Sequence, residues 1–294
     1  MQVPSASMNK PFNKWVSALK TYDKRRRSKG LPPLDCKRIA FGDDAKFDFF
    51  NRGDLKIQVL GPLVENVDGN PALKFLGEPP EGPRVNQESL GLSDEEFGGY
   101  SASHTINGHS IVFRLVYGGF SYLFSGDLND EASRYLAKQH DAKKLTLQSD
   151  VFKVPHHGSA DFSGGFIQRV EPVVSVVSSG DESARKEFIH PRATLMGALG
   201  KHSRVAEPLI FVTELVAFFQ VEGWSKLANP ETAEEKKKKD FFGFSRAAFG
   251  IVKTRTNGKR LLVYTDSANL KMKEAYAYSQ GANGIPESSK VRRA

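Results

Sequence analysis

Carboxylate and imidazole side chains follow two apolar runs near the middle of the chain. Tyr122–Phe124 is closely followed by Asp127, and Val151–Val154 is closely followed by His156 and His157. A buried strand that ends at such a residue holds the carboxylate or imidazole rigidly. These groups are ligands for Zn²⁺ and also for Mn²⁺ or Fe²⁺, and a bound ion lowers the pKa of its water toward about 7. The two strand ends therefore predict half of a metal site that could supply hydroxide for hydrolysis.

Further candidate ligands lie on either side of this stretch, and each has an ordinary alternative. His104 is better suited to an ordinary loop than to a functional role, and His190 directly precedes Pro191 in a segment that could simply be a turn. Asp127 could begin a helix, where the dipole favours a carboxylate. It is the ordered set that favours a metal site. The set consists of His104, His109, Asp127, His156, His157 and His190.

Composition narrows the class of protein. The chain has 294 residues, of which 39% are hydrophobic and 26% charged, as in a soluble globular protein. Its single cysteine, Cys36, excludes an internal disulfide framework and a cysteine-based zinc site. No apolar run approaches the roughly 20 residues of a membrane span, so we expect a cytoplasmic protein with no membrane partner.

The net charge of +8 is compatible with nucleic-acid binding but does not establish it. Much of the basic charge is clustered at Lys24–Arg27, Lys236–Lys239 and Lys290–Arg293. These runs lack the interleaved aromatic residues of a nucleic-acid stacking platform. We interpret them as solvated linkers or tails, and nucleic-acid binding through them is the weaker hypothesis.

Hydrophobic periodicity predicts helices that alternate with strands through the middle of the chain, which indicates an α/β or α+β layered fold. We expect one domain over residues 1–278, with a helical lead-in at 1–50 and a long surface loop at 67–103. A disordered tail is expected at 279–294. Helices are predicted at residues 11–26, 131–140, 162–170 and 191–199, and strands at residues 55–60, 111–117, 120–124, 151–154, 173–177, 209–212, 250–254 and 260–265.

Five motifs follow one another along the chain: Asn107-Gly-His109-Ser, Ser125-Gly-Asp127, Val154-Pro-His156-His157-Gly-Ser159, Ser178-Ser-Gly-Asp181 and His190-Pro191. In this order they resemble the metallo-β-lactamase superfamily. More narrowly, they look like the hydrolase domain of ComEC-type DNA-uptake proteins and its stand-alone bacterial relatives. The resemblance covers about residues 55–265 and is specific over 104–192. It implies an αβ/βα sandwich with one or two metal ions at the sheet edge.

The resemblance also implies roles for individual residues. Asp127 would be the bridging or single-site carboxylate, and His109 with one of His156 and His157 would be imidazole ligands. His190 would be a further ligand or would contact the substrate's oxyanion. The implied activity is metal-dependent hydrolysis of a small-molecule or nucleic-acid-like ester or phosphodiester by metal-activated water. Zinc, or manganese or iron, would be the cofactor, with catalysis resting on Asp127, His157 and His190.

The sequence departs from the family in its main metal motif. His-x-His-x-Asp-His, which supplies several ligands in the family, does not occur, and no histidine precedes His104. We therefore expect an N-terminally incomplete fold that holds one ion or none. The alternative function is an inactive truncated fragment or pseudoenzyme that serves as a binding or structural module.

Overall fold

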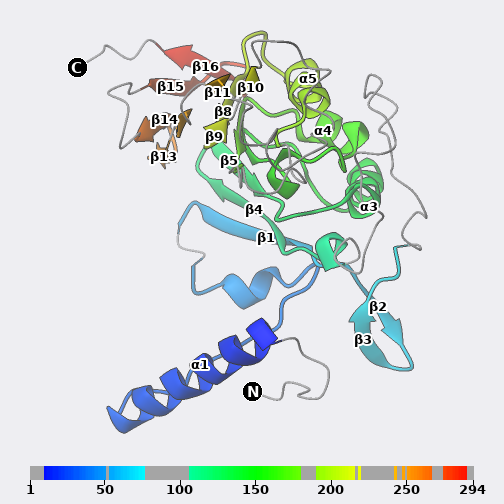
Figure 1. Cartoon of the computed structure of the whole chain (residues 1–294), viewed down its shortest axis with the longest axis vertical. Helices are drawn as coiled ribbons and strands as arrows, with labels where there is room; N and C mark the ends of the chain where they lie inside the picture. Colours follow the sequence, from blue (N-terminus) through cyan, green and yellow to red (C-terminus); the bar gives the residue numbers. More distant parts are fainter. Residues whose placement is uncertain are drawn as a thin grey trace, which may run out of the picture. The chain divides into compact units, whose positions relative to one another are not determined.

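Figure 1 shows the computed structural model of the chain, coloured along the sequence. The structure describes residues 10–50, 53–76, 106–179, 190–215, 218–219, 242–243, 247–248, 250–266 and 274–289. The chain divides into two compact units, one ending at Ile39 and the other beginning at Ala40. Across these described ranges, no helix is both long enough and apolar enough to cross a membrane.

Over residues 10–39, the part of the first unit that the structure describes, there is one long helix, α1 (Lys10–Ser28), which confirms the predicted helix. It ends at Ser28, and Gly30 shortly after it has a φ of +69°, in the left-handed region that glycine adopts freely. The amide of Leu31 donates to the carbonyl of Arg26, and the amide of Gly30 donates to that of Arg27, so two terminal carbonyls are satisfied. The basic run Lys24–Arg27, which we expected in a linker, therefore belongs to the last turns of this helix.

The second unit is built on a six-stranded sheet. Its strands lie in the order β1 (Leu55–Gly61), β4 (Val112–Tyr117), β5 (Phe120–Phe124), β6 (Val151–Lys153), β7 (Val174–Val177) and β8 (Leu209–Val212). Gly118 and Gly119 make the predicted hairpin between β4 and β5, and helical connections carry the chain between the parallel strands that follow. The inner parallel strands, β6 and β7, are rich in apolar residues because both of their faces are largely buried, whereas the edge strand β8 is mostly half-buried. The first three strands, β1, β4 and β5, pair antiparallel with one another. From β5 onward, β6, β7 and β8 each pair parallel with the strand before them.

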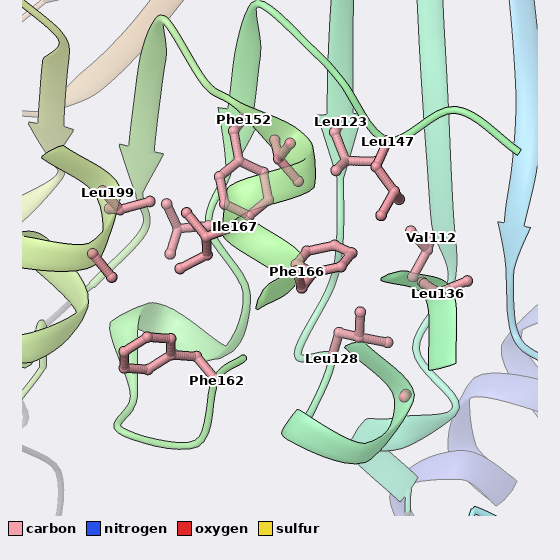
Figure 2. Packing of buried hydrophobic residues seen from close by; sticks show 14 of the residues in the cluster. Val112, Leu123, Leu128, Leu136, Leu147, Phe152, Phe162, Phe166, Ile167 and Leu199 are labelled. Atoms are coloured by element: carbon pink, nitrogen blue, oxygen red, sulfur yellow. The ribbon is translucent and has the colours of Figure 1, made fainter. Parts of the chain in front are cut away.

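Three helices cover one face of this sheet: α3 (Asp130–Asp141), α4 (Gly164–Val170) and α5 (Ala193–Lys201). Asn129 caps α3, because its side chain accepts a hydrogen bond from the amide of Ala132 at 3.1 Å. Ser163 caps α4 in the same way through Phe166. Figure 2 shows the core between helices and sheet, where Phe152, Phe166 and Ile167 are fully buried. Burial of this apolar surface is the main stabilising contribution to the layer.

An antiparallel four-stranded sheet packs on the other face of the central sheet. It consists of β13 (Ile251–Thr256), β14 (Arg260–Asp266), β15 (Ala275–Gln280) and β16 (Pro286–Ser289). Asn257 and Gly258 form the predicted hairpin turn, in which the Asn257 side chain accepts from the amide of Arg260 at 2.8 Å. Leu261, Val263 and Tyr278 bury themselves against Phe120, Tyr122 and Val151 of the central sheet. The helices and the two sheets thus confirm the predicted layered α/β fold.

Two predicted irregular regions contain paired strands. The tail expected to be disordered from residue 279 includes the end of β15 and all of β16, because buried Tyr278 anchors β15 in the second core. Part of the loop expected at 67–103 belongs to a hairpin, while residues 77–103 lie outside the described ranges. The remaining short elements are β2 (Val64–Val67) with β3 (Asn70–Leu73), β9 (Glu214–Leu215) with β12 (Ala247–Ala248), β10 (Phe218–Phe219) with β11 (Phe242–Gly243), and the 3-10 turns Asp44–Phe47 and His156–Gly158.

Replacing Phe166 by alanine tests the core between helices and sheet. The side chain is 1% exposed, and its removal should lower the free energy of unfolding by about 3–5 kcal/mol through lost burial and the cavity left behind. Ile251→Ala is the control, because that side chain is 63% exposed and its loss should change stability by no more than about 0.5 kcal/mol. Urea unfolding measures both, and equal effects would contradict this account of the core.

Candidate active site

The candidate residues lie where the parallel strands of the central sheet end. Asp127 follows β5, His156 and His157 follow β6, and Ser178 follows β7. Because the carboxyl ends of parallel strands share one edge, these residues approach one another in space. The amide of His156 donates to the carbonyl of Gly126 at 3.2 Å, which joins the first two strand ends directly.

Asp127 and His157 form the closest pair of predicted site residues. The Nε2 atom of His157 lies 3.5 Å from Oδ1 of Asp127, and both side chains are about half-exposed. The other ring nitrogen, Nδ1, lies 2.7 Å from the carbonyl oxygen of Ser178. A carbonyl oxygen can only accept, so Nδ1 must carry the proton. In the neutral ring Nε2 then holds a lone pair toward the carboxylate, and a proton or a metal ion between the two would satisfy both groups.

His156 points to different partners from its neighbour. Its Nε2 lies 3.4 Å from the side-chain nitrogen of Asn107, and its Nδ1 lies 3.9 Å from Oδ2 of Asp161. The sequence left open which of the two adjacent histidines faces Asp127, and in the structure it is His157. The difference arises in the backbone, because both histidines have positive φ values, +47° for His156 and +54° for His157. Such left-handed geometry is uncommon for residues other than glycine, and strained residues of this kind cluster at functional sites.

His190 approaches the same edge from the start of α5. Its ring centroid lies 6.3 Å from that of His156. The amide of Arg192 donates to the carbonyl of Gly158 at 2.8 Å, and a Cβ on Gly158 would lie 2.7 Å from the side chain of Pro191. Glycine at position 158 therefore allows the His190-Pro191 segment to pack directly on the histidine turn.

His109 belongs to a turn that packs against the Asp127 turn. The amide of Asp127 donates to the hydroxyl of Ser110 at 2.9 Å, and a Cβ on Gly126 would lie 2.8 Å from the Cβ of Ser110. Burial lowers the pKa of His109, which favours the neutral imidazole that metals bind. Its Nδ1 atom is buried with no hydrogen-bond partner among the described residues.

Lys153 is a site residue that the sequence analysis missed. Its ammonium group donates to the carbonyl of Gly126 at 3.0 Å and so supports the turn that carries Asp127. Burial lowers the pKa of Lys153, and the nearby charge of Asp127 opposes that shift. The available signal was one charged residue inside an apolar run, Val-Phe-Lys-Val, immediately before the two histidines.

The described residues do not assemble the complete ligand set. Within those residues, no three or more histidine, cysteine or acidic side chains are grouped closely enough to hold a metal ion. The structure brings Asp127 to His157, and His156 to His190 and Asp161. His104 and Asp181 lie outside the described ranges. Zn²⁺ usually takes about four ligands, so this donor set fits a metal ion only in part.

A cavity of about 960 Å³ lies beside α3 and α4 and reaches Asp161, the neighbour of His156. The amide of Asp130 donates to the carboxylate of Asp161, which links this wall to the start of α3. Basic and acidic side chains both line the cavity, so its charge alone does not select an anionic ligand. The charged lining residues are Lys74, Asp130, Glu131, Arg134, Lys138, Asp141, Asp161 and Arg169.

Two curated proteins are similar to part of the chain. ComE operon protein 3 from Bacillus subtilis (strain 168) is 31% identical over 98 residues, which are 33% of this chain and 12% of that protein. Competence protein ComA from Neisseria gonorrhoeae is 35% identical over 97 residues, which are 33% of this chain and 13% of that protein. A third of the chain is related to competence proteins. The predicted resemblance is confirmed to that extent, although the aligned part is only about an eighth of either relative.

Two other comparisons returned no relative. No family model matches the chain, and no solved structure matches it. The metallo-β-lactamase assignment, the metal ion and the hydrolase activity therefore stay predictions.

Replacing Gly126 by alanine tests the contact between the two turns. Gly126 has a φ of +55° and no room for a Cβ beside Ser110, whereas Gly42 has a φ of +84° with nothing within 4 Å of the added atom. Gly42→Ala should cost about 1 kcal/mol from backbone strain alone. Gly126→Ala should cost about 1–3 kcal/mol more because the added methyl group clashes. Equal losses in urea unfolding would mean that the turns are not packed as described.

Proposed function

We propose that the chain hydrolyses an ester or phosphodiester at the Asp127–His157 pair, with a zinc, manganese or iron ion as cofactor. The observation that carries this proposal is the 3.5 Å approach of His157 Nε2 to Asp127 Oδ1. Anchoring of Nδ1 by the Ser178 carbonyl orients the ring so that Nε2 is the free acceptor. The pair is open to solvent, so a substrate can reach it.

The partial similarity to competence proteins supports a nucleic-acid-like substrate. Competence is the uptake of DNA, and the bond that is broken when a DNA strand is cleaved is a phosphodiester. A single-stranded or double-stranded oligonucleotide is therefore the substrate to test first, with a small activated phosphodiester beside it. The ester class remains within the proposal because the pair itself recognises no base or sugar.

The chain's own residues have separable roles in this proposal. Asp127 and His157 would each supply one ligand to the divalent ion at the open edge of the sheet. Lys153 holds the Gly126 carbonyl and so positions the residue that follows it. Further ligands to the ion would come from His109 and His190 on neighbouring loops. His104 and Asp181 are also candidates, but they lie outside the described ranges.

A binding or structural module without catalysis is the second candidate. It is favoured by the absence of a three-ligand group within the part of the chain that the structure describes. The lack of any His-x-His sequence favours it as well. In this case the turn that contains His156 and His157 would have only a structural role, in packing against Pro191. The two candidates differ in metal retention and in turnover.

Asp127→Asn and His157→Gln test the proposal directly. Each should reduce the amount of ion retained by the purified chain and lower phosphodiester hydrolysis by about 100-fold or more, because each removes one of the two proposed ligands. Elemental analysis and cleavage of a labelled oligonucleotide with added Zn²⁺ or Mn²⁺ provide the two readouts. Asp68→Asn is the control, since Asp68 lies exposed in the β2–β3 turn, and it should retain both properties. A parent chain that binds no ion and cleaves neither substrate would favour the binding module instead.

A further inference from the structure

The helix of the first unit exposes a row of large apolar side chains. Phe12, Trp15, Leu19 and Tyr22 recur at intervals of three and four residues and therefore share one face of α1. Phe12 is 43% exposed, and Trp15 and Tyr22 are each 51% exposed. The rings of Phe12 and Trp15 stack with their centroids 5.3 Å apart. Leu19, between Trp15 and Tyr22, is half-buried, and the neighbouring Val16 is buried. Three exposed aromatic side chains on one side of a charged helix indicate an interaction surface.

The opposite face of α1 is polar and basic. Lys10, Lys14 and Lys24 lie on it, and the hydroxyls of Ser17 and Thr21 donate to backbone carbonyls one turn earlier, each at 2.9 Å. The whole helix has seven basic residues and one acidic residue, which gives it a net charge of +6. Most of the chain's net charge of +8 is therefore concentrated in these 19 residues.

Helix stability does not account for all of this charge. Arg25, Arg26 and Arg27 suit the negative end of the helix dipole, and Arg27 also pairs with Asp23 at 2.9 Å. Lys10 and Lys14 lie at the positive end, where no acidic residue occurs in the first turn. The dipole disfavours cations at that end, so the basic face runs along the helix for another reason. An anionic partner would compensate for this cost.

The separation of the two faces identifies the kind of partner. A groove for single-stranded nucleic acid interleaves aromatic and basic side chains on one face, so that bases stack while phosphates are neutralised. In α1 the aromatic row and the lysines lie on different faces, and only Arg26 approaches the apolar side, with its guanidinium 5.8 Å from the Tyr22 ring. A helix that lies in a membrane surface has this arrangement, with aromatic side chains inserted and basic ones among the head groups.

We propose that α1 binds the surface of a membrane that contains anionic lipids, with Phe12, Trp15, Leu19 and Tyr22 inserted below the head groups. The helix would lie parallel to the membrane plane. This proposal differs from the expectation of no membrane partner, which was based on the absence of an apolar span. It does not depend on the proposed hydrolase activity.

Vesicle binding by the full chain tests this proposal. The chain should sediment with vesicles of phosphatidylcholine and phosphatidylglycerol but only weakly with pure phosphatidylcholine, and raising the salt to about 0.5 M should weaken binding. The emission of Trp15 should shift to shorter wavelength on binding, measured with Trp224→Phe so that Trp15 is the remaining indole. Equal binding to both vesicles, or none to either, would overturn the proposal.

Two double variants distinguish insertion of the α1 aromatic side chains from non-specific adsorption by exposed aromatic residues. Phe12→Ser with Trp15→Ser should weaken binding to the anionic vesicles by about tenfold or more, because two inserted rings are lost. Phe49→Ser with Phe50→Ser is the control, since this exposed aromatic pair lies outside α1, and binding should be unchanged. If both double variants bind like the parent, α1 does not insert. If single-stranded DNA displaces the chain from the vesicles, and the Phe12→Ser, Trp15→Ser variant fails to bind that DNA, α1 is a nucleic-acid site and the membrane proposal is wrong.

Discussion

The parallel pairing of β5, β6 and β7 is the constraint on which the candidate site depends. Tyr122 pairs with Val151, and Val151 pairs with Val174, so the three strands run in register toward one edge. A slip of one residue in β6 would displace the histidine turn relative to Asp127, because that turn follows the strand closely. Burial on both faces prevents such a slip, since it would move Phe152 out of the core beneath the helices.

A buried acid fixes the same strands at their other end. The carboxylate of Asp150 accepts from the amide and the hydroxyl of Ser121, at 2.6 Å and 2.8 Å, and forms an ion pair with Arg204. The Asp150 carbonyl accepts from the amides of Val173 and Val174. This one residue thus connects the starts of β5, β6 and β7 with the segment before β8. Rigid strand starts and a packed core leave the opposite edge as the place where polar side chains can converge.

Much of the fold could be predicted from local patterns. Asn129 as a helix cap, Asn257 in a hairpin and the apolar runs of the parallel strands each have a short-range physical cause. The strand β16 could not be predicted in this way, because Pro286–Ser289 has little apolar character and is held by pairing with β15. Long-range pairing leaves no signal in a polar segment, so composition alone indicated a disordered tail.

The candidate site was predictable in its residue types but not in its pairings. Strand ends and turn glycines pointed to Asp127 and to the two histidines, yet the side-chain directions of His156 and His157 depend on two successive left-handed residues. The preference of histidine for left-handed backbone is too weak to predict two such residues in succession. The importance of Lys153 was likewise hidden, because its role comes from a hydrogen bond to a residue 27 positions away.

The protonation state of the His157 ring tests the central claim most directly. Long-range ¹H–¹⁵N correlation spectra, with His157 assigned by its loss in His157→Gln, report which ring nitrogen carries the proton. The account predicts a proton on Nδ1 and a change at Nε2 when Zn²⁺ is added, with that change abolished in Asp127→Asn. A neutral ring protonated on Nε2, or an Nε2 signal that Zn²⁺ leaves unchanged, would contradict the assignment of this pair as the metal-binding and catalytic centre.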